Sequence, residues 1–403
     1  MIETRPLESV VSSDALQAPE VQLPVGSEPD RVVSPGDVDE CARVMAWASE
    51  CGVGVLPVGN GGQLRPVAPG RSWVALSTHR LDGIETYEAA DLTLTAGSGT
   101  AMADIGVAMR REGQWAPFDP PGVRQGTIGG LVSTGRSGAL WAGYGELRNH
   151  VLGATVVTGD GRVLRLGGRV VKNVAGYDLL KLLVGGRGAF GLMTSVCIRA
   201  FPEPIQDRVL VLAATSVSEL AEASRRIATA PIVPASAVVV DRLPTSDTPG
   251  LALRLHGSKV TVDADQRSLE DHLGVKLATV DDPVSFVEGV SERCGAETVV
   301  VRLSTSPSHF GGFLELADGD AVSSVALDPY GARGRVAFAD SEAATSSGLL
   351  ERAASDGAWA VERAPADSVL WLDEPAVSDG ERALIEGLHR TFDPQGILWP
   401  TRS

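Results

Sequence analysis

The chain has 403 residues, of which 43% are hydrophobic and 21% are charged, the balance of a soluble globular protein with room for two or three domains. Its formal net charge of −16 argues against nonspecific binding to nucleic acid and against docking on anionic lipid. The chain begins without the apolar stretch of a secretory signal and has no run of 18 apolar residues, so we expect a cytoplasmic protein that could reach a membrane through partner subunits.

The cysteine and histidine spacings predict no metal centre. Cys41, Cys51, Cys197 and Cys294 form no C-x-x-C pair, so no iron–sulfur cluster or metal held by this chain alone is expected. The histidines show no H-x-x-x-H or H-E-x-x-H spacing. Reduced thiols are the expectation for a cytosolic protein.

The first elements in chain order predict a β-α-β unit. Residues 1–25 are polar and aperiodic and are expected to form a tail. A short strand at 32–33 precedes a helix that begins after Asp37 and ends at Gly52, because apolar residues recur there at helical spacing. The apolar, β-branched run 53–58 predicts a buried strand that delivers the chain into a glycine-rich loop.

The rest of the first half predicts short strands and helices. They are a strand at 92–96, a helix at 101–112, a hairpin over 151–166, a helix at 179–184 and a strand at 192–198. The Asp-Gly pair at 160–161 supplies the turn of the hairpin.

A change of pattern after Pro204 predicts a second domain. Strands are expected at 209–213, 235–240, 251–255, 299–304, 321–326 and 334–339, and helices at 217–227, 262–272 and 379–392. The simplest assembly of the elements before the last helix is an antiparallel sheet covered by helices, an α+β cap.

Two glycine-rich segments carry the strongest functional signal. They read PVGNGGQL at 57–64 and FDPPGVRQGTIGGLVSTGRSG at 118–138. Glycine lets the backbone approach a ligand closely, and successive N–H groups in such turns bind anions. Either loop alone could be a tight turn, but two in one domain suit a dinucleotide. The G-x-G-x-x-G nicotinamide fingerprint and the Walker A loop are both absent.

With two further blocks, these loops resemble the vanillyl-alcohol oxidase / p-cresol methylhydroxylase (PCMH-type) family of FAD proteins. The further blocks are a Tyr-Gly pair at 144–145 followed by VLGATVVTGDGRVLRLGG at 151–168, and KNVAGYDLLKLLVGGRGAFGLMTSVCIRAFPEP at 172–204. Order and spacing agree over residues 26–205. The KNVAGYDL string and the short chain are similar to the E-type, FAD-binding subunits of bacterial glycolate oxidase (glycolate dehydrogenase).

The resemblance implies an α+β fold class with four parts. A tail at 1–25 would precede a two-subdomain PCMH-type FAD-binding domain at 26–205 and an α+β cap with an antiparallel sheet at 206–375. The segment 376–403 would be a C-terminal helix and a tail, FDPQGILWP, that returns to the FAD-binding domain. Trp399 stands where the family often has Asn, which puts the polar contact of that Asn in question.

The resemblance also implies the cofactor site. Noncovalent FAD is expected, because the 57–64 loop has no His and the 119–138 segment has neither His nor Cys, the residues that some family members link to flavin. The residues expected to bind FAD are Pro57, Gly59, Asn60, Gly61, Gly62, Gln63, Leu64, Pro120, Thr127, Ile128, Gly129, Gly130, Ser133, Thr134, Ser137, Gly138, Tyr144, Gly188, Gly191 and Leu192.

Three residues of the predicted cap are candidates for catalysis. A hydroxy-acid dehydrogenase needs a flavin that accepts hydride, a base for the hydroxyl proton and an arginine that orients the carboxylate. Arg254 and His256 alternate onto one face of a predicted strand and are candidates for orienter and base. Arg302 is a second candidate orienter. The alternative for Arg254 and His256 is a solvated face of the cap sheet.

The favoured hypothesis is an FAD-binding subunit of a glycolate-oxidase-like complex, which oxidises glycolate to glyoxylate and passes electrons onward. The family implies a hetero-oligomer with a D-type flavoprotein and an iron–sulfur F-type subunit. Two alternatives stay open. One is a self-sufficient FAD-dependent 2-hydroxy-acid dehydrogenase of the D-lactate type. The other is a non-catalytic assembly subunit whose FAD is structural or relays electrons.

Overall fold

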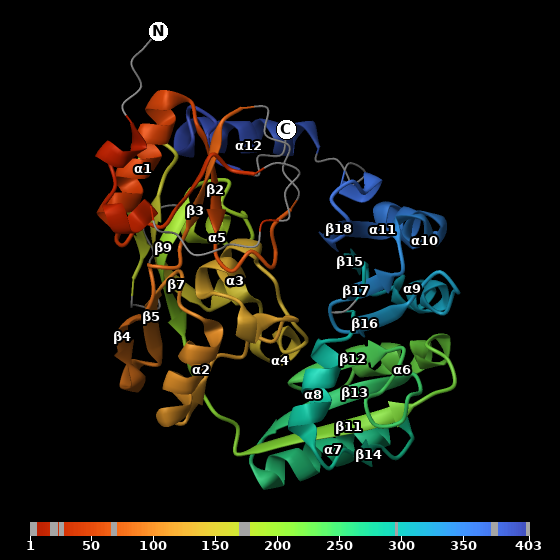
Figure 1. Ribbon diagram of the computed structural model, residues 1–403. Helices are drawn as coiled ribbons and strands as arrows, with labels where there is room; N and C mark the ends of the chain where they lie inside the picture. Colours follow the sequence, from red (N-terminus) through yellow and green to blue (C-terminus); the bar gives the residue numbers. More distant parts are fainter. Residues whose placement is uncertain are drawn as a thin grey trace.

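The structure, a computed structural model, describes residues 6–16, 23, 28–65, 71–168, 178–294, 297–371 and 378–399. The elements up to β10 (Phe201–Pro202) form an N-terminal domain, which lies beside a cap that is built on one large sheet (Figure 1). The last helix and strand-like segment lie back against the N-terminal domain (Figure 1). Most of the KNVAGYDL string, residues 172–177, falls outside the described residues.

The N-terminal domain begins with a small parallel sheet. Its elements are β1 (Arg31–Val33), α1 (Val38–Cys51), β2 (Gly54–Val58) and β3 (Trp73–Ser77), and the strand order is β1-β3-β2. The carboxylate of Asp37 accepts the N–H of Glu40 at the start of α1, and Gly52 ends the helix with a φ of +66°. The predicted β-α-β unit is present, but β3 lies between its two strands, an insertion that the sequence did not predict.

A five-stranded antiparallel sheet forms the rest of this domain, in the order β4-β5-β9-β7-β8. Ile105 and Ile128, from two of its helices, pack into one core with Leu94, Val156 and Val196 of the sheet. The elements are β4 (Ile84–Glu88), β5 (Thr93–Gly97), α2 (Met102–Arg111), β6 (Gln114–Trp115), α3 (Ile128–Thr134), α4 (Trp141–Tyr144), β7 (Val151–Val157), β8 (Val163–Gly167), α5 (Leu179–Leu183), β9 (Leu192–Arg199) and β10 (Phe201–Pro202).

The predicted polar tail is in part packed, which corrects the expectation for residues 1–25. Two 3₁₀ turns, Leu7–Ser9 and Ser13–Leu16, bring Leu7, Val10 and Ala15 into the core between α1 and the parallel sheet. The N–H of Ser34 donates to the carbonyl of Ala15 at 2.7 Å. Three apolar residues without strand or helix periodicity give no sequence signal for such packing.

The cap is an eight-stranded antiparallel sheet in the order β14-β11-β13-β12-β16-β17-β15-β18, covered by helices. This agrees with the predicted antiparallel α+β cap. Its elements are β11 (Gln206–Ala213), α6 (Ala221–Ala228), β12 (Ser236–Val240), β13 (Gly250–Gly257), α7 (Lys259–Leu273), β14 (Ala278–Thr279), α8 (Pro283–Ser291), β15 (Val299–Thr305), α9 (Phe310–Ala317), β16 (Ser324–Asp328), β17 (Arg333–Phe338), α10 (Ser341–Ser346), α11 (Leu349–Asp356) and β18 (Gly357–Arg363).

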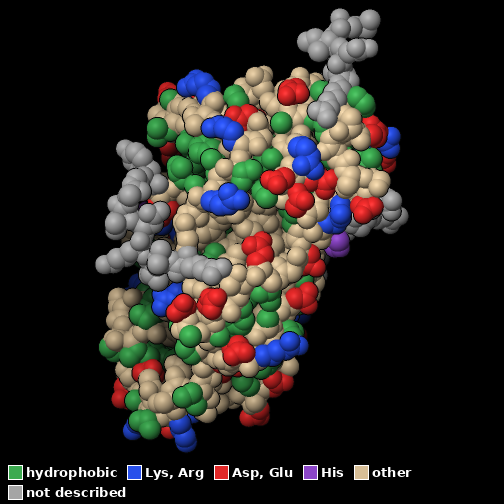
Figure 2. All heavy atoms as spheres, turned by 90° about the vertical axis from the view of Figure 1, so that its left-hand side faces the viewer, with side chains coloured by type: hydrophobic (Ala, Val, Ile, Leu, Met, Phe, Trp, Pro, Cys, Tyr) green, Lys and Arg blue, Asp and Glu red, His purple; other side chains and the backbone are tan. Residues whose placement is uncertain are grey.

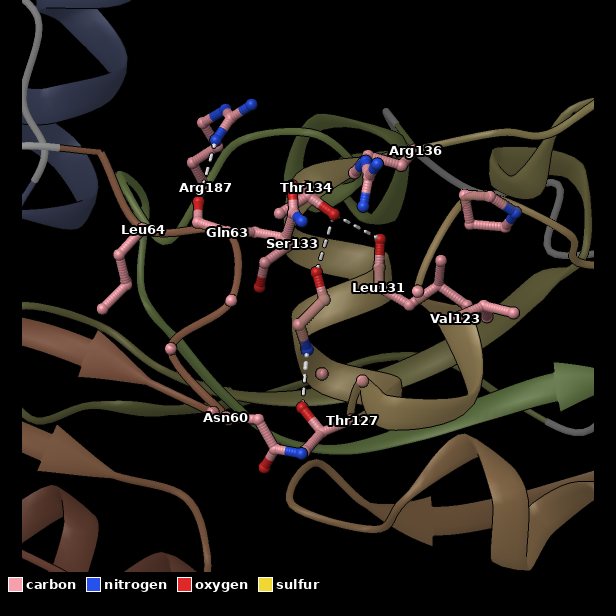
Figure 3. A pocket seen from close by; sticks show the side chains of 18 of the residues that line it. Asn60, Gln63, Leu64, Val123, Thr127, Leu131, Ser133, Thr134, Arg136 and Arg187 are labelled. Atoms are coloured by element: carbon pink, nitrogen blue, oxygen red, sulfur yellow. Dashed lines mark hydrogen bonds between the residues drawn. The ribbon is translucent and has the colours of Figure 1, made fainter. Parts of the chain in front are cut away.

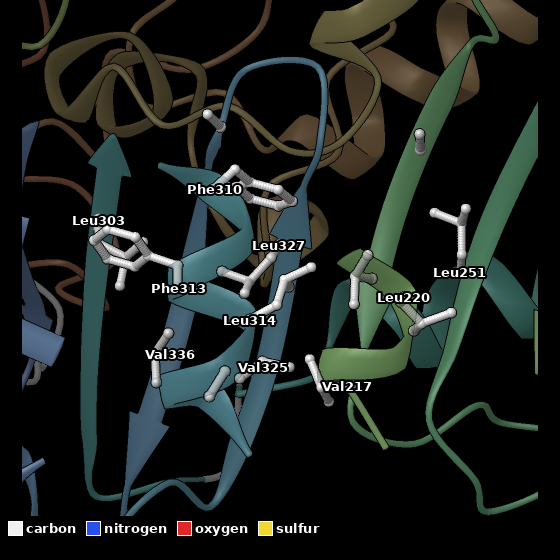
Figure 4. Packing of buried hydrophobic residues seen from close by; sticks show 14 of the residues in the cluster. Val217, Leu220, Leu251, Leu303, Phe310, Phe313, Leu314, Val325, Leu327 and Val336 are labelled. Atoms are coloured by element: carbon white, nitrogen blue, oxygen red, sulfur yellow. The ribbon is translucent and has the colours of Figure 1, made fainter. Parts of the chain in front are cut away.

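The main core of the cap lies on one face of this sheet. Helices α6, α7, α9 and α11 cover that face, and Phe313 and Leu314 of α9 pack onto Val325, Leu327 and Val336 (Figure 4). The other face carries a smaller core beneath α8. The remaining part of that second face looks toward the N-terminal domain, and there the side chains are polar.

The last segment of the chain lies beside β2. After α12 (Asp379–Phe392), the carboxylate of Asp393 accepts the N–H groups of Ile397 and Leu398 at 2.9 and 2.8 Å. The N–H of Val55 then donates to the carbonyl of Ile397, and the N–H of Trp399 donates to that of Val55. The indole of Trp399 packs in an apolar cluster, so hydrophobic contact replaces the polar contact expected of an Asn.

Acidic and basic side chains are interspersed on the face of the N-terminal domain in Figure 2. This distribution agrees with the acidic composition and shows no basic stripe on that face. Among the described residues, no helix combines the length and the apolar composition needed to cross a membrane. The same residues contain no cluster of three or more His, Cys, Asp or Glu side chains suited to a metal ion.

Candidate functional site

A cavity of about 580 Å³, called the first cavity, lies between the two glycine-rich loops. The loop after β2 forms one wall, and the segment around α3 forms another. The turn before β9 and residues of the cap close it, among them Cys294, Arg335 and Glu362. Figure 3 shows Asn60 and Thr127 at one end of this space and the arginines Arg136 and Arg187 at the other.

The second glycine-rich segment contacts the first loop and the residue after β5 at positions where only glycine fits. A Cβ on Gly59 would lie 2.7 Å from Oγ1 of Thr127, and one on Gly129 would lie 2.7 Å from Cβ of Ser98. Thr127 also accepts the N–H of Gly130 at 3.1 Å and thereby caps α3 (Figure 3). A Cβ on Gly62 would meet no atom within 4 Å, because that position faces open space in the cavity.

The structure brings together almost all residues expected to bind FAD. Ser137 and Gly138 line a neighbouring cavity, described below. Ile128 is buried in the core beneath α3, and Tyr144 lines neither cavity. The others all line the first cavity: Pro57, Gly59, Asn60, Gly61, Gly62, Gln63, Leu64, Pro120, Thr127, Gly129, Gly130, Ser133, Thr134, Gly188, Gly191 and Leu192.

A second cavity of about 500 Å³ adjoins the first and shares residues with it, among them Arg65, Arg187 and Arg335. Its floor is the polar face of the cap sheet. Arg302 on β15 lies opposite Arg335 on one side and Ala360 on the other. Residues opposite each other in an antiparallel pair share a face, as do residues two apart along a strand. Ser304, Ala326, Asp328 and Ala358 therefore belong to the same floor, and their small or short side chains leave space around Arg302.

The second cavity is cationic although the whole chain is acidic. Seven arginines and three carboxylates line it, in a protein of net charge −16. Several arginines are paired: Arg333 with Glu146 at 3.3 Å, Arg293 with Asp241 at 3.2 Å, and Arg335 with Glu362 at 2.7 Å. The wall therefore favours an anionic ligand.

Two cavity arginines have no carboxylate partner among the described residues. Arg302 makes no hydrogen bond or ion pair there, and Arg187 only donates to the carbonyl of Gln63 at 3.4 Å (Figure 3). Desolvation lowers the pKa of both guanidiniums, although Arg302 keeps an exposed surface, and for Arg187 the neighbouring Arg65 and Arg302 add to the effect. A ligand with negative groups would relieve this concentration of charge.

Two carboxyl groups on the second cavity have a raised pKa. Burial raises the pKa of Asp119 to about 6, although the N–H groups of Ala139 and Leu140 donate to it. Burial likewise raises the pKa of Asp328 to about 6, against the opposing hydrogen bond from the indole N–H of Trp141. A pKa in this range suits a general base near neutral pH.

Arg254 and His256 lie outside both cavities. Nε and Nη2 of Arg254 donate to Oδ1 and Oδ2 of Asp207, at 2.8 and 2.6 Å. His256 approaches Asp207 with Nε2 at 3.2 Å and Tyr144 with Nδ1 at 2.7 Å. The two residues do share one face of β13, as predicted, but that face contacts the N-terminal domain through Tyr144. This placement gives no support to their prediction as orienter and base.

The charged residues of the first cavity that were not singled out from the sequence include Arg136, Arg187, Arg335 and Glu362. Arg136 lies inside the second glycine-rich segment and Arg187 inside the 172–204 block, where a cation with glycine as a close neighbour was the available signal. Arg335 lies on β17, a predicted cap strand, and Glu362 lies on β18, which was not predicted. Neither residue has a local sequence signal that marks it as part of the site. Only the sheet register places them beside the loops.

Residues 29–167 match the family described as "FAD binding domain". The chain carries an FAD-binding domain. The match supports FAD as the cofactor and agrees with the predicted PCMH-type resemblance. The chain is also 30% identical over 258 residues to the glycolate oxidase subunit GlcD of Bacillus subtilis (strain 168), which covers 60% of this chain and 55% of that protein.

Two further relatives are a second glycolate oxidase subunit and a D-lactate dehydrogenase. The glycolate oxidase subunit GlcE of Escherichia coli (strain K12) is 41% identical over 123 residues, 30% of this chain and 35% of that protein. A D-lactate dehydrogenase of Archaeoglobus fulgidus is 32% identical over 198 residues, 49% of this chain and 44% of that protein. The chain thus spans about half the length, or less, of these curated relatives.

A solved structure of an alkyldihydroxyacetonephosphate synthase has the same fold. It covers 93% of this chain and 76% of its own chain with a TM-score of 0.68 and 16% sequence identity. The similarity extends beyond the FAD-binding domain into the cap. It concerns the fold alone.

The residues of the first cavity fit FAD. The volume of about 580 Å³ lies in the usual range of ligand sites, about 300–1,000 Å³. The free space over Gly62 leaves room for a ligand against the backbone, and Arg187 and Arg136 provide positive charge for the phosphates.

Proposed function

We propose that this chain binds FAD noncovalently in the first cavity and oxidises a 2-hydroxy acid bound in the second. The observation that carries the proposal is Arg302: an arginine without a partner among the described residues, on a floor of small side chains next to the FAD site. Its guanidinium is suited to a paired hydrogen bond with a substrate carboxylate. The relatives named glycolate oxidase subunit and D-lactate dehydrogenase support the 2-hydroxy-acid class.

The residues of the chain would divide the work as follows. Bound FAD supplies the hydride acceptor. Arg302 would orient the carboxylate, and the cap sheet would exclude water above the reacting carbon. Asp119 and Asp328 are the cavity carboxylates with a raised pKa, and one of them would accept the hydroxyl proton.

We further propose that the chain acts as the E-type subunit of a glycolate-oxidase-like complex with a D-type flavoprotein and an iron–sulfur subunit. The similarity to GlcE of Escherichia coli and the absence of a cluster of metal-binding side chains among the described residues support this. The second candidate is a self-sufficient D-lactate-type dehydrogenase. Two observations favour it: the similarity to the Archaeoglobus enzyme, and a cap sheet that belongs to this chain itself. A flavin that only relays electrons is the third possibility.

One experiment tests these proposals. The purified chain is reconstituted with FAD, and its absorption is recorded before and after anaerobic addition of glycolate, D-lactate or D-2-hydroxyglutarate. Release of the flavin on denaturation would support noncovalent binding. Bleaching by one of the acids, lost in Arg302→Ala, would support oxidation at this site. A flavin that none of the acids bleaches, alone or with partner subunits, would contradict it.

Dye reduction then separates the candidates. Turnover by the isolated chain would favour the self-sufficient enzyme, whereas turnover only in the presence of partner subunits would favour the complex. The control is Arg225→Ala, an exposed cap arginine that pairs with Glu222 outside both cavities.

A further inference from the structure

Glu362 lines the first cavity, amid a group of arginines. Its side chain is only 5% exposed. Arg335 donates to it from Nε at 2.7 Å and from Nη2 at 3.2 Å, and Arg136 donates from Nη2 at 3.3 Å. Burial opposes its ionisation, but Arg335 and Arg136 outweigh burial and hold the pKa of this carboxyl well below its usual range.

Glu362 reaches this position through an irregularity in β18. The pairing with β15 passes from Val301 and Val361 to Val300 and Arg363, so that Glu362 is an extra residue on its strand. Such a bulge bends the strand and redirects a side chain. Here it places a carboxylate of the cap beside the second glycine-rich segment.

The two arginines that bind Glu362 also hold the backbone of that segment. Arg335 donates from Nη2 to the carbonyl of Ser137 at 3.2 Å. Arg136 donates from Nη1 to the carbonyl of Pro121 at 3.1 Å. One carboxylate on the cap thus fixes two guanidiniums, and each of these fixes a carbonyl in the 118–138 segment of the FAD site.

We infer that Glu362 is a positioning residue for FAD, which orients Arg136 and Arg335 so that the cap holds the second glycine-rich segment in its binding shape. The inference rests on the FAD site and does not depend on the proposed substrate. Without the carboxylate, the two guanidiniums would repel each other and the nearby Arg302, and the segment would lose both carbonyl contacts.

The direction in which removal of Glu362 changes FAD affinity distinguishes a positioning role from a purely electrostatic one. Glu362 is a negative charge on the wall of a site for an anionic cofactor. If it acted only through charge, its removal would strengthen FAD binding. If it positions the arginines, its removal weakens binding although the site becomes more positive.

The test is the Kd of the apo-chain for FAD, measured by the quenching of flavin fluorescence. Glu362→Gln is expected to weaken binding by about tenfold, the usual effect of losing charge-assisted contacts. The control is Glu270→Gln, which removes another buried cap carboxylate, paired with Lys276 outside both cavities, and is expected to leave the Kd unchanged. Binding by Glu362→Gln as tight as in the wild type, or tighter, overturns the inference.

A second variant covers the case in which Glu362→Gln does not fold, judged by circular dichroism. Glu362→Asp keeps the charge but is too short to hold both guanidiniums. Weaker FAD binding by this variant supports positioning, and wild-type binding overturns it. If no hydroxy acid reduces the flavin of the wild type, the proposed function is contradicted. The Kd values for FAD then still decide the inference about Glu362 on their own.

Discussion

The hydroxyl of Tyr144, in the FAD-binding domain, lies 2.7 Å from Nδ1 of His256 in the cap. Tyr144 also meets Phe201 and Trp115 edge to face, and His256 approaches Asp207, which in turn binds Arg254. These contacts connect β13 to α4, which precedes the β7–β8 hairpin. We interpret the group as an interface between the domains, distinct from the two cavities.

A variant of His256 tests this interpretation. We expect His256→Ala to lower the free energy of unfolding by about 1–2 kcal/mol through the loss of its buried hydrogen bond with Tyr144 and of its contact with Asp207. Stopped-flow reduction of the flavin by the hydroxy acid is expected to stay within about threefold of wild type, because His256 does not line a cavity. The control is His309→Ala, at a half-exposed position on the other side of the cap sheet. A loss of reduction rate of about a hundredfold with an altered pH profile would restore His256 as the base.

Arg302 should decide substrate binding. Arg302→Ala is expected to lower kcat/KM for the hydroxy acid by about a hundredfold, because a charge-assisted pair with the carboxylate is lost. Arg302→Lys keeps a point charge but not the paired geometry and is expected to recover part of the loss. Steady-state kinetics of these variants beside Arg225→Ala would show the ranking. Equal values for Arg302→Ala and Arg225→Ala would remove Arg302 from the site.

Gly62 and Gly59 should respond differently to alanine. Gly62→Ala meets no protein atom within 4 Å, so the apo-chain should keep its melting temperature, while FAD binding weakens by about tenfold because the methyl group occupies ligand space. Gly59→Ala places a Cβ 2.7 Å from Oγ1 of Thr127 and should lower the melting temperature itself. Calorimetry and FAD titration separate the two effects. Unchanged FAD binding in Gly62→Ala would place the cofactor elsewhere.

Asp393 should be essential for docking of the last segment. Its carboxylate, which is 2% exposed, accepts two buried N–H groups that Asp393→Ala would leave without a partner. The expected loss is about 2–4 kcal/mol in the free energy of unfolding, measured in urea. Asp379→Ala, at the exposed start of α12, is the control and should cost under about 1 kcal/mol. Equal costs for the two variants would show that the segment contributes little to stability.

Asp328 should make stability depend on pH in an unusual direction. Its pKa is about 6 in the folded chain, above the usual value of about 3.9 in an unfolded one. The folded state therefore takes up a proton first, and this group stabilises the fold progressively as the pH falls from about 7 to about 4. The free energy of unfolding of wild type, relative to Asp328→Asn, should rise over that interval by up to about 1.4 kcal/mol per unit of pKa difference.

Unfolding in urea at several pH values measures this difference. A relative stability that falls with decreasing pH would show that the folded chain does not favour the protonated carboxyl. Asp379→Asn, at an exposed position, provides the matched charge change.

Local signals in the sequence were sufficient for much of the fold. The helix that became α12 was predicted with the bounds 379–392, because a polar cap and helical periodicity mark it. The α1 helix, the 151–166 hairpin and the antiparallel cap sheet were also predicted. β3 and β18 were not, since short runs without clear alternation give weak signals. The packed 3₁₀ turns at the start were missed for the same reason.

The glycine-rich loops, and with them the walls of the first cavity, were determined by the sequence itself, because close backbone approach requires glycine at fixed positions such as Gly59 and Gly129. The charged part of the site was decided only by the tertiary structure. Arg302 and Arg254 looked equivalent on their strands, yet Asp207 pairs with Arg254, while no described carboxylate pairs with Arg302. That difference arises from the strand order of the cap sheet and the docking of the cap, contacts between distant residues that local sequence patterns do not encode.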